Sequence, residues 1–252
     1  MGNVFEVKNI RMDFGSLHAL DDISFGVEEK SVTILIGPNG SGKTTLINVA
    51  SGVYKPTSGT VVYRGEDITK LPPYKIYNRG LVRTFQIPAL FSRLSVLENV
   101  MVAMKDNPGE AFAKSIFRPS WSKAEEQCAE EALQILQTVG LIKMWDQPAS
   151  SLSGGQMKLL EIGRAMMSGA KTLLLDEPIS GVNPTLAHEI FQKILSLRDS
   201  LGLTFLIVEH RLDIALSYVD SVVAMAYGKL LAQGKPEPVM TDPRLIEAYL
   251  GG

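Results

Sequence analysis

The chain has 252 residues, of which 45% are hydrophobic and 21% are charged, and its net charge is −2. So small a charge gives no general attraction for nucleic acid or an anionic membrane. No run approaches the roughly 18 apolar residues that cross a bilayer. Cys128 is the only cysteine, which excludes disulfides within the chain and thiolate metal clusters, and indicates a reducing compartment.

Strand-like and helix-like runs alternate along the chain, which is typical of an α/β protein with a parallel sheet. Residues 5–10 and 23–27 are predicted as strands, and residues 61–67 as a strand with a turn. This front part predicts an antiparallel β element beside the core. Residues 32–36 are continuously apolar and predict a buried strand. A helix follows the glycine-rich segment after that strand and is closed by Gly52.

Residues 96–140 are predicted to be mostly helical, with apolar residues at helical spacing from Ala129 to Val139. An irregular insert separates these helices, from Lys105 to Lys123. The second half of the chain predicts further regular elements: buried strands at 172–176 and 204–208, a helix at 184–200, and a hairpin around Gly228. We therefore expect an α/β core of residues 1–86 and 150–252, interrupted by a helical subdomain with its insert at 87–149.

The strongest local signal lies between the strand at 32–36 and the helix that follows it. It fits the pattern G-x-x-x-x-G-K-[ST] and consists of Gly37, Pro38, Asn39, Gly40, Ser41, Gly42, Lys43 and Thr44, followed by Thr45. Glycines let successive backbone N–H groups turn toward phosphate oxygens at the positive end of a helix. Lys43 can reach the β- and γ-phosphates, and Thr44 offers a hydroxyl to Mg²⁺. A plain glycine-rich turn is the alternative, and the flanking strand and helix argue against it.

An apolar strand ends in two carboxylates at Asp176 and Glu177. Its end places Asp176 at the carboxyl edge of the sheet, where α/β proteins bind ligands, and where Asp176 can hold Mg²⁺. Glu177 is suited to polarise an attacking water as a general base. Any buried strand can end in acidic residues, so this signal gains its force from the other motifs.

A second candidate anion site opens the helix that begins near residue 154. It consists of Ser153, Gly154, Gly155 and Gln156. Backbone amides and the helix dipole favour an anion there, although Ser153 alone would more simply be an N-cap. One ATP needs only one phosphate loop. A head-to-tail dimer explains the second site, because each ATP then lies between the phosphate loop of one chain and Ser153 of the other.

The ordered set GPNGSGKTT, Gln86, LSGGQ, LLLDEP and His210 resembles the ABC ATPase family over essentially the whole chain. The resemblance implies that Gln86 senses Mg²⁺ and the lytic water, and that His210 contacts the γ-phosphate. It implies that Phe14 stacks on adenine, although the family more often has Tyr there. Lys43, Gln86, Glu177 and His210 would be catalytic, and Thr44, Gln86 and Asp176 would serve the metal. Asn183 stands where many members have Asp in a dimer-contact loop.

Within that family, several details are similar to ATPases of branched-chain (hydrophobic) amino-acid uptake. These are RTFQ, the insert, GVNP, the Glu209–His210 pair and the ending AYLG. Urea or amide uptake and lipopolysaccharide or lipid export are alternatives, and a soluble ABC ATPase acting on nucleic acid is a more distant one. The resemblance implies ATP and Mg²⁺, two membrane permeases, a second identical or paralogous ATPase subunit, and an extracytoplasmic solute-binding protein. It places the chain at the cytoplasmic face of the membrane, without nucleic acid. Cargo, direction and dimer type stay open.

Overall fold

The computed structural model describes residues 2–84, 86, 89–105 and 122–250. The described chain divides into two compact units. The first comprises residues through Gln86 together with those from Lys171 onward, and the second comprises Ile87–Ala170. Most of the predicted insert, together with Ile87 and Pro88, lies outside the described residues.

An antiparallel sheet forms the front of the first unit, as predicted. Its strand order is β2-β1-β4-β5. The strands are β1 (Asn3–Phe14), β2 (Leu17–Glu28), β4 (Ser58–Tyr63) and β5 (Glu66–Asp67). Phe5 of β1 pairs with Val27 on one side and Tyr63 on the other, and all three side chains are buried.

A six-stranded sheet forms the centre of the first unit, in the order β10-β9-β3-β8-β7-β6. Its strands are β3 (Val32–Ile36), β6 (Leu81–Arg83), β7 (Thr172–Asp176), β8 (Thr204–Val208), β9 (Ser221–Ala226) and β10 (Lys229–Gly234). Every neighbouring pair is parallel except β9 and β10, which form the predicted hairpin. Because β3, β7 and β8 are parallel, the segments that follow them meet at one edge of the sheet.

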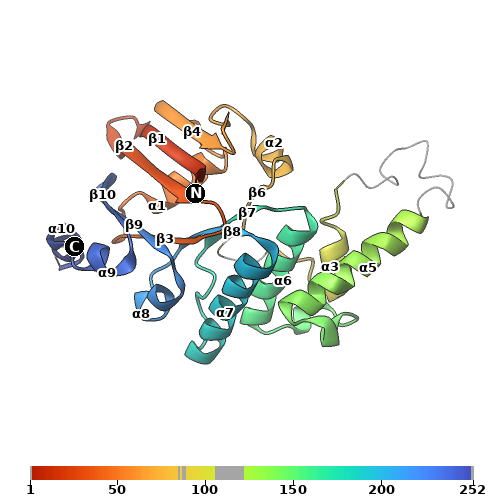
Figure 1. The fold of residues 1–252 in the computed structure, drawn as a ribbon. Coiled ribbons are helices and arrows are strands. Elements are labelled where there is room, and N and C mark those ends of the chain that lie inside the picture. Colours follow the sequence, from red (N-terminus) through yellow and green to blue (C-terminus); the bar gives the residue numbers. More distant parts are fainter. Residues whose placement is uncertain (1, 85, 87–88, 106–121, 251–252) are drawn as a thin grey trace. The chain divides into compact units, whose positions relative to one another are not determined.

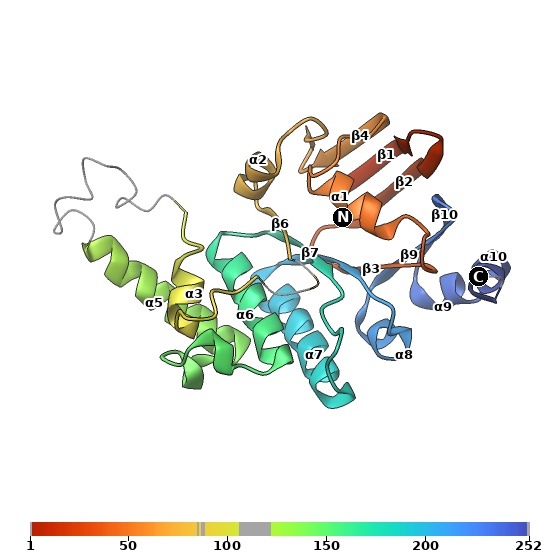
Figure 2. The same cartoon turned by 180° about the vertical axis from the view of Figure 1, so that it is seen from behind.

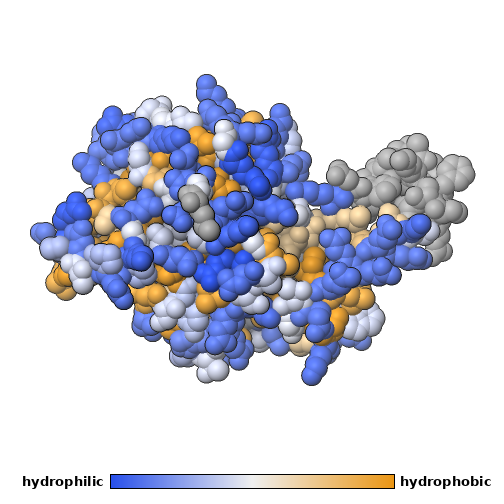
Figure 3. All heavy atoms as spheres, viewed as in Figure 1, coloured by the Kyte–Doolittle hydropathy of each residue, from blue (hydrophilic) through white to orange (hydrophobic). Residues whose placement is uncertain are grey.

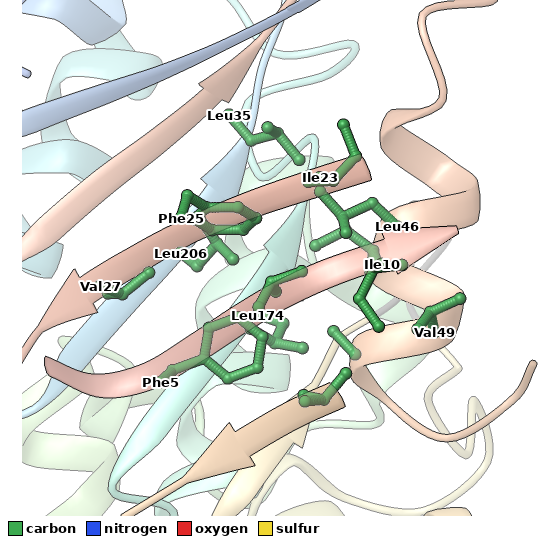
Figure 4. Packing of buried hydrophobic residues seen from close by; sticks show 14 of the residues in the cluster. Phe5, Ile10, Ile23, Phe25, Val27, Leu35, Leu46, Val49, Leu174 and Leu206 are labelled. Carbon is green, nitrogen blue, oxygen red and sulfur yellow. The ribbon is translucent and has the colours of Figure 1, made fainter. Parts of the chain in front are cut away.

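The helices of the first unit are α1 (Lys43–Ala50), α2 (Pro73–Asn78), α7 (Pro184–Leu201), α8 (Leu212–Ala215), α9 (Pro236–Met240) and α10 (Pro243–Leu250), with the 3₁₀ turn η5 (Leu216–Tyr218). Both views of the ribbon show α1 between the two sheets, with α7 on the other side of the central sheet (Figures 1 and 2). One apolar core fills the space around α1. Phe5 and Ile10 of β1 face Leu46 of α1, and Leu174 and Leu206 of the central sheet join them (Figure 4).

The second unit is helical, with α3 (Val96–Met101), α5 (Ser122–Val139), α6 (Gly154–Met167) and the 3₁₀ turns η3 (Ile142–Met144) and η4 (Ala149–Ser151). Its core includes Val100, Leu136 and Leu160, one from each α-helix. Gly163 permits close packing of α6, because a Cβ added there would lie 3.3 Å from Cγ2 of Ile135.

The second unit ends at Ala170, beyond the residue 149 at which the sequence analysis ended the helical subdomain. The difference is α6. We assigned this helix to the nucleotide core because of its motif, but its apolar side chains pack with α3 and α5. A helix belongs to the unit in which its apolar face is buried, whatever its motif contacts.

Candidate nucleotide site

The segment between β3 and α1 forms a loop that only glycine permits at two positions. Gly37 has φ 151°, and a Cβ there would lie 2.1 Å from the Met225 carbonyl oxygen. Gly42 has φ 100°, and a Cβ there would lie 2.8 Å from the Ala19 carbonyl oxygen. Gly228 N–H donates to the Ser41 carbonyl at 3.2 Å. The loop is therefore shaped by its own backbone and held by the β9–β10 turn.

Lys43 opens α1 and folds back over this loop. Its Nζ donates to the Gly37 carbonyl at 2.7 Å and to the Pro38 carbonyl at 2.9 Å. Burial lowers the pKa of the Lys43 ammonium, and the charge of Glu177 offsets part of that shift. The single cation of the loop thus lies beside the backbone that is shaped to receive phosphate oxygens.

Asp176 ends β7, and its carboxylate is paired with an arginine that we did not single out. Arg83 Nη2 lies 3.1 Å from Asp176 Oδ2, and both side chains are largely buried. Arg83 Nη1 also donates to Asn48 Oδ1 on α1 at 2.5 Å and to Ser51 Oγ at 3.4 Å. One guanidinium therefore connects β6, the end of β7 and the helix that follows the phosphate loop.

Glu177 lies between two of the other predicted catalytic side chains. Gln86 Nε2 donates to Glu177 Oε2 at 2.8 Å, and His210 Nε2 lies 3.3 Å from Glu177 Oε1. Glu177 has a left-handed backbone (φ 48°), which is uncommon outside glycine, Asn and Asp. The structure thus brings together Gln86, Glu177 and His210 from three separate stretches of the chain.

A cleft of about 590 Å³ unites these parts within the first unit. Its lining includes the predicted residues Phe14, Asn39, Gly40, Ser41, Gly42, Lys43, Thr44, Thr45, Asp176, Glu177 and His210. Phe14 is 44% exposed, and its ring packs edge-on against Tyr54 with centroids 5.6 Å apart. This size falls in the range of small-molecule sites. The aromatic ring and the phosphate loop supply a surface for a base and a surface for phosphates in one cleft.

The donor set of the cleft fits Mg²⁺. Thr44 contributes a hydroxyl and Asp176 and Glu177 contribute carboxylates, and oxygen donors are what this cation takes. Among the described residues, no cluster of three or more His, Cys, Asp or Glu side chains is arranged for a metal. Mg²⁺ needs no such cluster, because it is usually held by one or two carboxylates together with phosphates and waters.

The second predicted phosphate site belongs to the helical unit and does not line this cleft. Ser153 is the N-cap of α6: its Oγ accepts from Gln156 N at 3.4 Å, and Gln156 Oε1 accepts from Ser153 N at 2.8 Å. A Cβ added at Gly154 would meet nothing within 4 Å. Asn183 is likewise an N-cap, accepting from Leu186 N at 2.9 Å. Both residues thus have ordinary capping bonds within this chain.

Sequence reasoning missed several residues around the cleft. His18 lines the cleft, and its Nδ1 lies 2.6 Å from Asp13 Oδ1. Tyr227 lines it too, from the β9–β10 turn. The sequence analysis named Arg83 only within the segment RTFQ and Glu209 only as the neighbour of His210, and it gave neither residue a role. The one available signal was that of Glu209, because a charged residue directly after a buried strand needs a buried partner.

Comparisons with known proteins show which family this chain is similar to. Residues 20–180 match the ABC transporter family. A probable branched-chain amino acid transport ATP-binding protein, LivG, of Archaeoglobus fulgidus is 46% identical over 98% of this chain and 95% of its own. The BraF protein of Pseudomonas aeruginosa, a high-affinity branched-chain amino acid transport ATP-binding protein, is 38% identical over 98% of each chain.

A solved ATP-binding cassette of an ABC transporter, in its ADP conformation, superposes with a TM-score of 0.87 at 44% identity and covers both chains fully. A phosphate loop, a strand-end carboxylate pair and an aromatic ring in one cleft define a nucleoside-triphosphate-binding protein. The chain belongs to the ABC transporter family, as one of its ATP-binding proteins. Of its described helices, none has both the length and the apolar character to cross a membrane.

Proposed function

We propose that this chain hydrolyses ATP through Glu177 and thereby powers import of branched-chain or other hydrophobic amino acids. The observation that carries the hydrolytic part is the Glu177 carboxylate, held by Gln86 and His210 at the edge of the phosphate-loop cleft. The relatives LivG and BraF, whose names specify branched-chain amino acid transport, support the cargo.

The residues divide the work of phosphoryl transfer. The backbone of Gly37–Thr45 and the Lys43 ammonium hold the β- and γ-phosphates, and Phe14 stacks on adenine. Glu177 accepts the proton of the attacking water, with Gln86 orienting that water and His210 contacting the γ-phosphate. Thr44, Gln86 and Asp176 would hold Mg²⁺, which would supply positive charge to neutralise the phosphates. Positioning and electrostatics supply most of the rate enhancement in such reactions.

The test of this assignment is Glu177→Gln. The amide keeps the size of the side chain and its bond to Gln86, but it cannot accept a proton. Turnover should fall by about 10² to 10⁴, while Mg-ATP binding persists. Steady-state hydrolysis and fluorescence titration with an ATP analogue measure the two quantities. Wild-type turnover in the variant would remove Glu177 from the role of base.

The cargo is tested in cells, because cargo does not touch this chain. Deletion of the gene should abolish energy-dependent uptake of radiolabelled leucine, isoleucine and valine, and a plasmid copy should restore it. Urea uptake in the same strain is the control. Unchanged amino-acid uptake together with lost urea uptake would replace the proposed cargo.

The partners that we propose are two permeases, a second ATPase subunit that is identical or paralogous, and an extracytoplasmic solute-binding protein. The chain would then work at the cytoplasmic face of the membrane. We place the permease contact at the loop after Gln86. Phe91 is 49% exposed there, and the Arg164 guanidinium lies 5.4 Å from its ring centroid. Figure 3 shows apolar surface on the helical unit, over the region of α3 and α5. Exposed apolar patches mark partner sites.

The backbone of Phe91 is hydrogen-bonded on both sides to one buried side chain. Phe91 N–H donates to Asn99 Oδ1 at 2.9 Å, Asn99 Nδ2 donates back to the Phe91 carbonyl at 3.0 Å, and Asn99 is fully buried. Phe91→Glu should therefore leave folding and ATP binding intact while abolishing pull-down of the permeases. Normal assembly of the variant would place docking elsewhere, and we would turn to the insert at 105–123.

A further inference from the structure

Three successive residues after β8 each contact the segment from Glu177 to Val182. Glu209 Oε1 accepts from Ile179 N at 3.0 Å. His210 Nε2 lies 3.3 Å from Glu177 Oε1. Arg211 Nη1 donates to the Val182 carbonyl at 3.0 Å. The loop after β8 (residues 209–211) and the loop after β7 (residues 177–182) lie about thirty residues apart in sequence. All three residues of the first loop contact the second.

Glu209 is the buried member of this set, with 2% of its surface exposed. Its two carboxylate oxygens receive three backbone N–H groups: Ile179 at Oε1, and His210 (3.0 Å) and Arg211 (3.4 Å) at Oε2. Burial raises the pKa of the Glu209 carboxyl, and the three N–H groups oppose that rise. A carboxylate suits this place because it has only acceptors, and the three backbone groups that bond to it are donors.

The bond to Ile179 lies next to a strained residue. Glu177 has a left-handed backbone, and its N–H donates to the Val208 carbonyl at 2.9 Å. Such a conformation costs free energy and persists where surrounding contacts over-determine it. The Val208 carbonyl fixes the segment just before the strained Cα, and Glu209 fixes it two residues later. Together they determine where the Glu177 side chain points.

We propose that Glu209 is a positioning residue of the ATPase: its buried carboxylate locks the loop that carries Glu177 to the loop that carries His210. Glu209 is not among the described residues that line the cleft. It acts through the other two, by keeping the base and the γ-phosphate contact at a constant separation during hydrolysis. The inference rests on the proposed roles of Glu177 and His210.

Glu209→Gln is the variant that separates positioning from general stability. The amide keeps the volume and one acceptor oxygen, but its NH₂ group then meets a backbone N–H, donor against donor. The matched control is Glu98→Gln in the helical unit. Glu98 Oε2 also accepts a backbone N–H, from Ser95 at 2.7 Å, and it lies outside the cleft.

The experiment measures kcat and KM for ATP in the wild type, Glu209→Gln, Glu177→Gln, the double variant and Glu98→Gln. Hydrogen exchange of the Ile179 amide is measured alongside. In Glu209→Gln, kcat should fall by about tenfold to a hundredfold, KM should stay within about twofold, and the Ile179 amide should exchange faster. The double variant should be no slower than Glu177→Gln, because the effect passes through Glu177.

Unchanged kcat in Glu209→Gln would overturn the proposal. So would a double variant slowed by the full factor of both single changes, because Glu209 would then act independently of Glu177. Should Glu209→Gln not fold, Glu209→Asp replaces it, since it keeps the charge but shortens the reach to Ile179. Failure of both to fold, with Glu98→Gln folded, would make Glu209 a structural residue only. Wild-type turnover in Glu177→Gln would instead refute the proposed base, independently of what Glu209→Gln does.

Discussion

Two helices of this chain begin at sequences that predict phosphate binding, and their first turns are built differently. α1 follows Gly42 in a left-handed conformation, and no side chain of the described residues caps it. Its first residues, Lys43 to Thr45, line the cleft. α6 follows Ser153, which forms a reciprocal capping box with Gln156. The first turn of α1 leaves its backbone N–H groups without a side-chain cap from the described residues and faces the cleft. The first turn of α6 has a backbone N–H capped by Ser153 of its own chain.

The comparison shows that a phosphate-binding motif in the sequence does not by itself form a complete phosphate site within one chain. The α1 start has the loop, the cation and the facing carboxylates in one unit, so a single chain can hold the phosphates there. The α6 start has an exposed Gly154, a buried Gly155 and a cap, and it lies in the other unit. We infer that Ser153, Gly154 and Gly155 meet nucleotide only when a second chain presents them. Monomer binding should then depend on α1 alone, and hydrolysis on both.

Of the changes at the two helix starts, Lys43→Ala in α1 has the largest expected effect, because it acts on both ATP binding and hydrolysis. It removes the only cation of the loop, so hydrolysis should fall by about a hundredfold to a thousandfold and ATP binding to the single chain should weaken. Fluorescence titration and phosphate release measure these. If affinity and rate both stayed at wild-type values, the phosphate-loop assignment would be wrong.

Ser153→Arg at the α6 start should act on a different quantity. The long side chain would occupy the place of the partner's γ-phosphate, so ATP-driven dimerisation should be lost while ATP binding to the single chain is kept. Size-exclusion chromatography with ATP, in the Glu177→Gln background, reports the dimer. An equal loss of monomer affinity would put Ser153 in the site of its own chain and erase the contrast between the two helix starts.

Ser153→Ala should have the smallest effect of the three changes, a modest loss in the free energy of unfolding. It removes the cap of α6, which is worth about 1 kcal/mol, and leaves the glycines in place. Chemical denaturation measures the loss in free energy of unfolding, and the same sample gives the hydrolysis rate. A loss of activity far beyond that of stability would show that the hydroxyl itself meets nucleotide.

Sequence patterns predicted the strands, the helices and the phosphate loop because each of these depends on neighbouring residues. The strand β3, the loop Gly37–Thr44 and the helix α1 are one continuous stretch. The meeting of Gln86, Glu177 and His210 followed only from resemblance. The Arg83–Asp176 pair spans 93 positions and the Glu209–Ile179 bond spans 30, and no spacing rule reveals either. The assignment of α6 to the helical unit depended on which apolar face it packs against, which a motif does not specify.

The most direct test of the central claim mixes two inactive chains, Lys43→Ala and Ser153→Arg. If each ATP is held by α1 of one chain and α6 of the other, a mixed dimer contains one intact site. Each variant alone should hydrolyse ATP at about a hundredth of the wild-type rate or less. The equimolar mixture should regain a clearly higher rate that increases with protein concentration. A mixture as inactive as its components, with both variants folded and dimers of Lys43→Ala and wild-type chains active, would contradict the account.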